Sequence, residues 1–398
     1  MLAFSNKSKE INVAMFRMKQ SSDTLIKAFS PILFLFYMTG IQATSCPETY
    51  LKDRFRVLLW NTPMYFYNFF WVLTVISEIT WVIFFSDTKL ELAECFIVCL
   101  LMTCRFFVSK HRSKIHILLE KLSELSKILR SSINRKRLYI LIVLCNLFMI
   151  GVAFILGVAF ISFSFKYHVS STVLNSTLIS NRLKRHFITS RKWILGLTTI
   201  QTYVIAISVT NYYCFVCYCI RLFCSEFVLK SRTLMKQHGY PTILHSYQKI
   251  TTAIAFADDF LSYPVFIIVL SSMVGLFWST YSFVFVPRDD NMFCICFLSG
   301  IVYYSTSLLI VMLTGAVANQ AVVLARETVI SLPGWIRQHY KELKMDIRQR
   351  FKHKTYFTLW NIYIIDKSLL ISALGTLVTY GILIGTLGSV QGKKENIM

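Results

Sequence analysis

Charged side chains are scarce in this chain, and acidic ones are the scarcest. Asp, Glu, Lys and Arg make up 16% of the 398 residues, whereas about a quarter of the residues in a soluble globular domain carry a charge. Apolar residues reach 55%, and the mean hydropathy is +0.55. This composition excludes an ordinary water-soluble domain and indicates a protein that crosses the membrane several times.

The chain also lacks the motifs of catalysis and of cofactor binding. It contains no HExxH, GxSxG, P-loop or GxGxxG sequence. All of its eleven cysteines except Cys46 lie within or at the edges of long apolar segments, which is not the pattern of a disulfide framework. We therefore predict no enzyme activity, no cofactor and no metal site.

Seven apolar segments approach or exceed the roughly 20 residues that a helix needs to cross a bilayer. They are Tyr65–Phe85, Leu92–Val108, Leu138–Phe163, Trp193–Phe223, Leu261–Val286, Phe293–Ala318 and Ser368–Val390. A weaker segment, Leu25–Ile41, contains Lys27 and Pro31. We expect it to lie in the interface or to re-enter the membrane, with a full span as the alternative. The predicted fold class is an all-α polytopic membrane protein with seven transmembrane helices.

The basic residues predict the orientation. Thirty of the 42 Lys and Arg fall before the first span or in the loops 109–137, 224–260 and 319–367, and ten fall on the other side. Because cytoplasmic loops are enriched in Lys and Arg, we predict an N-terminus inside and a C-terminus outside. Residues 1–24 mix charged and apolar residues without a continuous apolar core, so we also predict no cleavable signal peptide. The sequon at Asn175 then lies outside, where we expect glycosylation. This bias accounts for the net charge of +22, so we expect contact with membrane lipids and no nucleic acid.

The cytoplasmic segments carry helical periodicity. His111–Leu129 repeats its apolar residues at helical spacing, so it either bundles with other helices below the membrane or lies on the inner leaflet as an amphipathic helix. The pattern of Val322–Phe351 also predicts a helix, with an interruption around Pro333. We divide the chain into a cytoplasmic N-terminus (1–64), a six-helix transmembrane bundle (65–318), a cytoplasmic helical anchor (319–367), a final span (368–390) and an extracellular tail (391–398).

The final span carries two different stripes when it is wound at about 100° per residue. Gly381, Gly385 and Gly388 fall on one stripe, and Ser372, Thr376, Thr379, Leu383, Thr386 and Val390 fall on the opposite side. Glycines let a neighbouring helix approach closely, and hydroxyls interrupted by apolar residues suit a water-filled path. One helix cannot enclose a path, so the pattern favours an oligomeric pore. The alternative is that the hydroxyls bond to carbonyls of the preceding turn.

The same span carries a resemblance to a known family. Thr379-Tyr380 is followed by five mostly apolar residues, Gly381–Gly385. This pattern, the seven spans and the basic helical segment before the last span resemble the insect gustatory receptors, which are related to the insect odorant receptors. The family continues with Gln-Phe, where this chain has Thr386-Leu387. The departure leaves the ion selectivity open.

The resemblance implies a tastant-gated, non-selective cation channel of the plasma membrane. Such channels are homotetramers or mixed tetramers of receptor subunits, and the last helix of each subunit lines the pore. Carried over, the gate positions are Leu383, Thr386 and Leu387. Two alternatives stay open, which are an odorant-receptor-type subunit and a transporter of small solutes. A transporter of the common kind has two related halves, and we find no internal repeat.

In this family the ligand pocket opens to the outside within each subunit. The outer halves of the third to sixth spans hold aromatic and polar residues that suit a small organic tastant. The candidate ligand-binding residues are Gln201, Tyr203, Trp278, Tyr281, Tyr303 and Tyr304. The alternative is an aromatic belt at the membrane interface, which the position of Tyr281 near a span end favours.

The predicted orientation can be tested directly. We expect an epitope tag after Met398 to be stained by antibody on intact cells, because the charge bias places the C-terminus outside. The same tag at the N-terminus serves as the control and should need permeabilised cells. Staining of the C-terminal tag only after permeabilisation would reverse the orientation.

Overall fold

A computed structural model provides the structure. It describes residues 27–41, 65–77, 89–129, 135–164, 181–236, 240–285, 291–335 and 355–379, together with the single residues 25, 62, 345 and 349. The labelled helices are α4 (Lys89–Lys110), α5 (Arg112–Ile128), α6 (Arg135–Ser164), α8 (Asn181–Lys236), α9 (Tyr240–Phe285) and α10 (Asn291–Trp335), and a short hairpin follows with strands β1 (Thr358–Leu359) and β2 (Tyr363–Ile364). Three further apolar helices cover Lys27–Met38, Tyr65–Ser77 and Lys367–Thr379.

The chain folds as an almost entirely helical bundle. Among the described residues, four helices are long and apolar enough to cross a membrane, and they contain Lys136–Ala159, Gly196–Ser231, Pro241–Val284 and Cys294–Ser331. Each described part of the seven predicted spans is helical. The all-helical class is therefore confirmed, while the number of spans and the orientation of the termini stay predictions.

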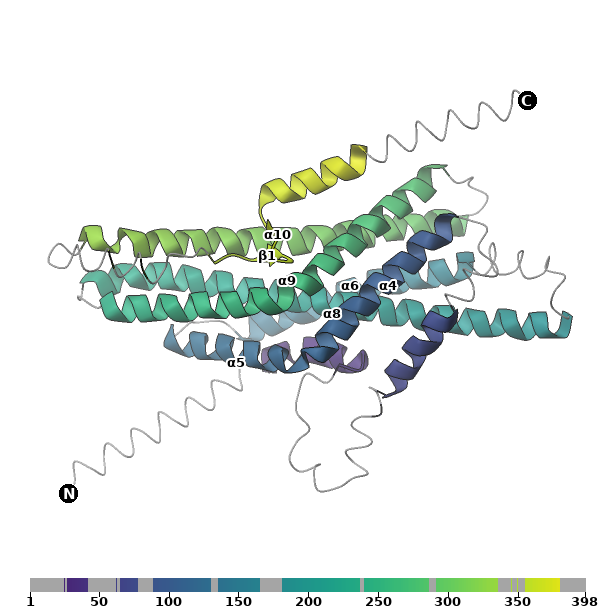
Figure 1. The fold of residues 1–398 in the computed structure, drawn as a ribbon, viewed down its shortest axis with the longest axis horizontal. Coiled ribbons are helices and arrows are strands. Elements are labelled where there is room, and N and C mark those ends of the chain that lie inside the picture. The colour runs from purple at the N-terminus through teal and green to yellow at the C-terminus, as the bar shows by residue number, and fades with distance from the viewer. Residues whose placement is uncertain are drawn as a thin grey trace, which may run out of the picture.

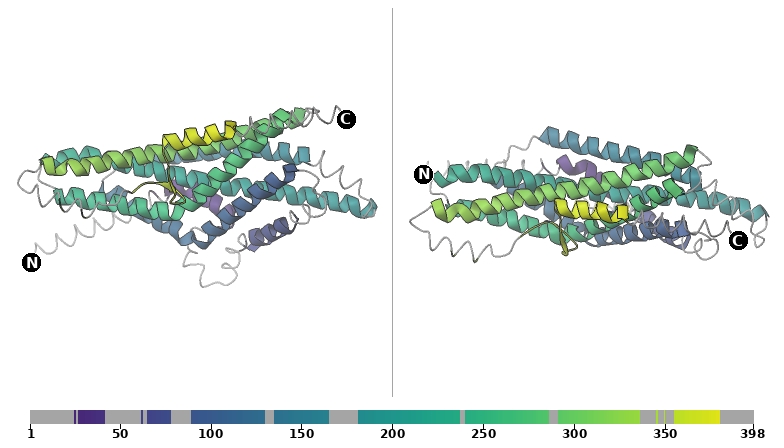
Figure 2. Two further views of the ribbon diagram at one scale, coloured as in Figure 1. Left: turned by 45° about the horizontal axis from the view of Figure 1, so that its top comes forward. Right: turned by 90° about the horizontal axis from the view of Figure 1, so that it is seen from above.

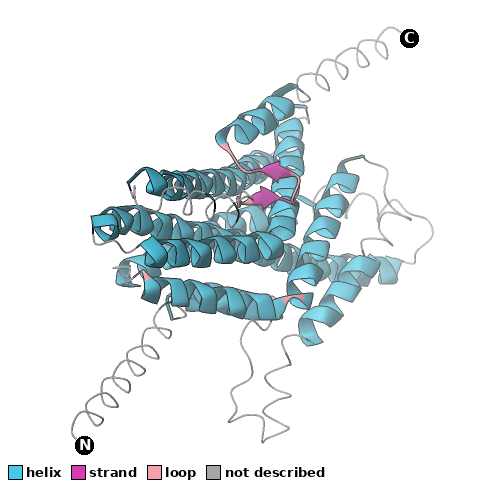
Figure 3. Cartoon of the chain, turned by 60° about the vertical axis from the view of Figure 1, so that its left-hand side comes forward, coloured by secondary structure: helices cyan, strands magenta, loops and turns pink. Residues whose placement is uncertain are grey.

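The long helices extend well beyond the length of a bilayer. Helix α8 has 56 residues and is therefore about 84 Å long, against a hydrocarbon core of about 30 Å. The ends of α8 and α10 and the beginning of α9 gather at one end of the molecule, on the left of Figure 1, where α5 packs against α8 and α9. In Figure 3 these segments stack as a compact bundle, whereas other helices splay apart on the opposite side. The compact end contains the segments that the charge count assigns to the cytoplasm.

The packing of helix α5 decides whether the segment after the second predicted span is a bundled helix or a helix lying on the inner leaflet. One face of α5 is completely buried, and its members are Ile115, Leu118, Leu119, Leu122 and Leu125. These side chains belong to the main core, where α5 packs against α8 and α9. The interpretation as a bundled helix is correct, because a helix lying on the inner leaflet would turn this face to lipid.

The N-terminal apolar segment forms a short helix inside the bundle. Lys27–Met38 has 12 residues and a length of about 18 Å, which is too short for a straight span. Its end is a Schellman motif, since the Ile41 amide donates to Phe36 O at 2.9 Å and Gly40, at φ 74°, takes the left-handed position. Phe29 and Phe36 lie edge-on to the ring of Tyr212 in α8. Whether the segment re-enters the membrane stays a prediction.

A buried arginine joins this segment to two neighbours. Arg105 of α4 is 8% exposed. Its Nε donates to Thr39 O at 3.2 Å, and its Nη2 donates to Asn68 Oδ1 at 2.8 Å. The guanidinium also lies 5.7 Å from the ring centre of Trp71, within cation–π range. Sequence patterning placed Arg105 only near a span end, whereas the structure makes it the junction of three elements.

The segment before the last helix differs from the prediction. A helical anchor was expected over 319–367, but residues 355–366 form coil and the antiparallel hairpin β1–β2, with Thr358 opposite Ile364 and Leu359 opposite Tyr363. Helix α10 continues past the expected span end at residue 318 to Trp335, so the described start of the predicted helix Val322–Phe351 is helical. The helix Lys367–Thr379 leaves the hairpin near the middle of the molecule and lies along the outside of α10 (Figure 1 and Figure 2).

Candidate functional site

The predicted ligand-binding residues partly converge. Tyr203 of α8, Trp278 of α9 and Tyr303 and Tyr304 of α10 belong to one buried cluster. The ring centres of Tyr203 and Tyr303 are 5.0 Å apart, and those of Tyr303 and Tyr304 are 5.2 Å apart, with both pairs near T-shaped geometry. Four of the six residues therefore form one aromatic cluster, which Met149 and Leu156 of α6 and Leu35 of the N-terminal helix help to enclose.

The other two residues lie elsewhere. Gln201 is buried, but it precedes Tyr203 by two positions and so lies about 200° around α8 from it. Thr198, one turn before Gln201, contacts Thr74 across a 2.9 Å hydrogen bond. The face of α8 that carries Gln201 therefore turns towards the helix Tyr65–Ser77. Tyr281 stacks on Phe277 of its own helix.

Several polar atoms near the aromatic cluster are buried without a hydrogen-bond partner. Among the residues that the structure describes, this holds for Trp278 Nε1, Ser282 Oγ, Tyr303 Oη and, on the other face of α8, Gln201 Oε1. Trp278 and Ser282 are four residues apart and share one face of α9. Buried polar groups normally find a partner, in protein, water or ligand. These groups are suited to bind a small molecule that carries a neutral donor or acceptor.

A glycine makes room for one wall of the cluster. The ring of Tyr304 lies directly over Gly275 of α9, and a Cβ added there would overlap three of its ring carbons. Helix α9 passes without interruption through Gly275 and through Pro264. The glycine therefore serves close packing, and neither residue breaks the span.

In the described part of the last helix, which ends at Thr379, the hydroxyl residues of the predicted polar stripe are exposed. Ser372, Thr376 and Thr379 are all exposed, whereas Leu370 is buried and Leu369 and Leu377 pack against the main core. Thr376 Oγ1 donates to Ser372 O at 2.8 Å, and Thr379 Oγ1 donates to Gly375 O at 2.9 Å. The two threonine hydroxyls thus bond to their own helix, as the alternative reading of the stripe proposed, and they still face outward from the bundle.

The remaining site predictions lie outside the described residues. These are the gate and stripe positions Leu383, Thr386, Leu387 and Val390, the packing glycines Gly381, Gly385 and Gly388, and the glycosylation site Asn175. They stay predictions.

Sequence patterning missed the attachment of the last helix to the bundle. Asn319 of α10 is buried, and its Nδ2 donates to Phe357 O and Ile365 O, both at 2.9 Å. Its Oδ1 accepts from the Phe357 amide at 2.7 Å. On the other side, Asp258 of α9 accepts from the Thr358 amide at 2.7 Å. The Leu369 amide then donates to Asp366 at 2.7 Å, so Asp366 caps the last helix.

Comparisons with known proteins bear on this fold. The chain matches no protein-family model and no curated protein by sequence. Among solved structures it is similar to the insect olfactory receptor OR5 from Machilis hrabei, with a TM-score of 0.71 and 12% identity over 91% of this chain and 98% of that one. The same receptor in complex with eugenol gives a TM-score of 0.68 and 15% identity over 92% and 99%. The chain has the fold of an insect chemoreceptor related to the odorant receptors, as the sequence resemblance predicted.

The role of Gly275 yields a stability prediction. We expect Gly275→Ala to displace the ring of Tyr304 and to lower the free energy of unfolding by about 1–3 kcal/mol, because overpacking a tight contact costs that much. Thermal unfolding of the detergent-solubilised protein measures the change. Gly151→Ala is the matched control, since a Cβ at Gly151 meets no atom within 4 Å. Equal effects of the two substitutions would contradict the packing role.

The attachment through Asn319 yields a second prediction. We expect Asn319→Leu to leave the Phe357 amide and Ile365 O without this partner and to raise hydrogen–deuterium exchange over 355–366, because each buried unmade hydrogen bond costs about 1–3 kcal/mol. Gln320→Leu is the control, because it replaces an amide side chain by leucine at the next residue of α10, which is exposed. If both variants exchange alike in this segment, Asn319 does not hold the hairpin.

Proposed function

We propose that the chain is a subunit of a ligand-gated, non-selective cation channel of the insect chemoreceptor type, a gustatory receptor that responds to a small organic tastant. The observation that carries the proposal is the fold likeness over nearly the whole length of both chains. The aromatic cluster supplies the chemistry of a ligand site. The channel needs no catalytic residues, in agreement with the motifs that the sequence lacks.

The ligand that suits the cluster is neutral. Tyr203, Trp278, Tyr303 and Tyr304 offer aromatic faces together with hydroxyl and indole N–H groups, and none of them carries a charge at neutral pH. Aromatic faces favour a ligand with an aromatic ring or a compact apolar body. An unpartnered indole N–H or tyrosine hydroxyl adds one hydrogen bond to a hydroxyl or carbonyl group. One solved neighbour is a complex with eugenol, and the present cluster suits molecules of that general size and polarity.

The exposed surface of the last helix supports an assembly of several copies. Apart from its hydroxyl face, the helix leaves Ile371, Leu374 and Val378 exposed, at 70%, 37% and 61%. A single helix cannot surround an ion path, so copies of this helix around one axis would have to form it. We propose a tetramer, made of identical subunits or of this chain with related receptor subunits, in the plasma membrane.

An odorant-receptor-type subunit is the second candidate, and a specific observation favours it. The two solved structures named above are of one olfactory receptor. The two candidates share the channel and differ in the source of the ligand, which is dissolved tastant in one case and volatile odorant in the other. A panel that contains both kinds of compound separates them.

Electrical recording tests the proposed class. We expect whole-cell cation currents when the chain is expressed in heterologous cells and a panel of neutral aromatic and aliphatic compounds is applied, with no added G protein or nucleotide. Leu383→Ser should raise the current without ligand, because a polar side chain favours water at an apolar constriction. Leu374→Ser, the same change off the polar stripe, is the control. Uptake of ligand coupled to an ion gradient, without unitary conductance, would indicate the transporter.

A further inference from the structure

An open cavity lies away from the aromatic cluster. Its volume is about 630 Å³, and it is lined by Met102, Thr103, Phe106 and Phe107 of α4, by Asp259, Ser262 and Tyr263 of α9, and by Trp360 and Asn361 at the tip of the hairpin. Binding sites for small molecules usually measure about 300–1,000 Å³. We call this cavity the α4–α9 groove. None of its lining residues belongs to the aromatic cluster.

The α4–α9 groove is mostly apolar in its lining, with Asp259 as the one charged lining residue, and lysines follow beyond one end of it. Its lining residues on α4 follow helical spacing, and the next positions on that stripe are Lys110 and, after the bend at His111, Lys114. Lys110 is exposed. Lys114 Nζ lies 2.7 Å from Asp259 Oδ2, and the two side chains are 30% and 66% exposed. Lys114 therefore contacts a carboxylate of the groove wall, and helical spacing places Lys110 one turn before it. Together with Asp259, the two lysines carry one excess positive charge.

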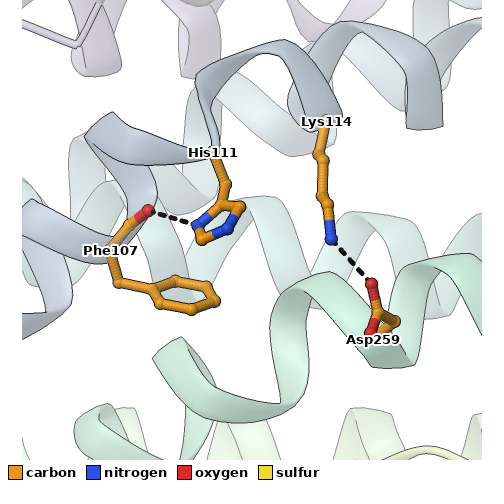
Figure 4. Close-up of polar contacts among 4 residues, drawn as sticks. All are labelled: Phe107, His111, Lys114 and Asp259. Atoms are coloured by element: carbon orange, nitrogen blue, oxygen red, sulfur yellow. Dashed lines mark hydrogen bonds and ion pairs between the residues drawn. The ribbon is translucent and has the colours of Figure 1, made fainter.

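The close-up of this end shows how the side chains are held. His111 lies at the bend between α4 and α5 and contacts Phe107 O at 3.0 Å (Figure 4). A carbonyl oxygen can only accept, so Nδ1 of His111 carries the hydrogen. Lys114 points from α5 across to Asp259 of α9 (Figure 4). A lysine ammonium has three donors, so Lys114 can keep this ion pair and still bind an anion.

The hairpin supplies the wall opposite α4. Trp360 is 49% exposed and has a φ of 51°, and its neighbour Asn361 has a φ of 56°. A bulky residue rarely takes this left-handed conformation. The turn is held by the Trp360 amide, which donates to Ser262 O at 3.2 Å, and by ring contacts of Trp360 with Tyr263 and Phe266. Half-exposed tryptophan is typical of the boundary between hydrocarbon and water.

We propose that the α4–α9 groove binds an anionic glycerophospholipid, with an acyl chain along Met102–Phe107 and the phosphate against Lys110 and Lys114. An apolar groove that ends in basic side chains complements a lipid with an anionic headgroup, and basic pockets between transmembrane helices commonly bind such headgroups. The predicted orientation places this lipid in the cytoplasmic leaflet. A soluble anion would leave the apolar part of the groove unfilled. The proposal does not depend on the channel function, because it concerns lipid binding alone.

Photolabelling tests the proposal on the intact chain. The protein is reconstituted into phosphatidylcholine nanodiscs that contain a phosphatidic acid with a diazirine in one acyl chain, and the labelled residues are mapped by mass spectrometry. We expect adducts on the groove residues of α4, on Tyr263 and on Trp360. A phosphatidylcholine probe with the same diazirine chain should label these residues far less. Equal labelling by both probes would overturn the headgroup assignment.

Matched variants separate the headgroup from the acyl chain. Lys110→Gln combined with Lys114→Gln should reduce labelling by about fivefold for each lysine removed, because each basic side chain near anionic lipid contributes roughly that factor. Lys249→Gln is the control. Like Lys114, Lys249 forms an exposed ion pair between α5 and α9, with Glu124 at 3.0 Å, but it lies outside the groove. Thr103→Trp, which fills the groove from an exposed position, should abolish labelling there while thermal unfolding stays cooperative.

Two results would overturn the proposal. One is the absence of groove adducts with either probe, and the other is undiminished labelling in the double lysine variant. A photoreactive amino acid at position 103 identifies the molecule that covers the groove. Crosslinks to lipid support the proposal, whereas crosslinks between two chains would show that a second copy of the protein fills the groove.

Discussion

The hydrogen bonds of Asn319 and Asp258 are the contacts on which the arrangement of the C-terminal part depends. A helix satisfies its own backbone groups, which is why long helices can cross or leave a bilayer without outside partners. The stretch 355–366 is not helical and packs against the bundle with Phe357 and Ile365 fully buried, so its amides and carbonyls need partners from elsewhere. One amide side chain on α10 and one carboxylate on α9 supply them, and they thereby fix where the last helix begins.

The hairpin and the aromatic cluster satisfy their polar groups in different ways. At the hairpin, side chains bond to the backbone, and the aspartate at position 366 caps the helix that follows. In the aromatic cluster, the indole of Trp278 and the hydroxyl of Tyr303 lack a partner within the described structure. A fully bonded junction resists movement, whereas unpartnered groups in an apolar setting gain free energy when a ligand supplies the missing bond. The contrast agrees with the proposed receptor, in which the ligand site has to respond while the support of the last helix holds.

The apolar surface of the bundle has two kinds of environment. Helix α6 exposes a broad aliphatic and aromatic surface, including Leu144, Leu147, Phe148 and Phe154, which suits the fluid hydrocarbon of a bilayer. The α4–α9 groove is concave, and Lys114 contacts Asp259 of its wall, so the proposed lipid would be held in a defined place. Its outer wall is the turn at Trp360, so the occupant would touch the segment that leads into the last helix.

The sequence by itself determined the helical class, the positions of the long apolar segments and which face of α5 is apolar, because these depend on local hydropathy and on periodicity within one helix. It also placed four members of the aromatic cluster among six candidates, but it could not exclude Gln201, whose position about 200° from Tyr203 on α8 matters only once neighbouring helices are in place. Only the tertiary structure decided the junction at Arg105, the hairpin and the α4–α9 groove. Thr358 and Ile364 pair in strands of two residues each, too short for any alternating pattern, and their stability comes from Asp258 and Asn319, which lie 100 and 38 positions away from the residues they bind. Contacts between residues so distant in the chain leave no periodic signal, because the folding of the whole bundle brings them together.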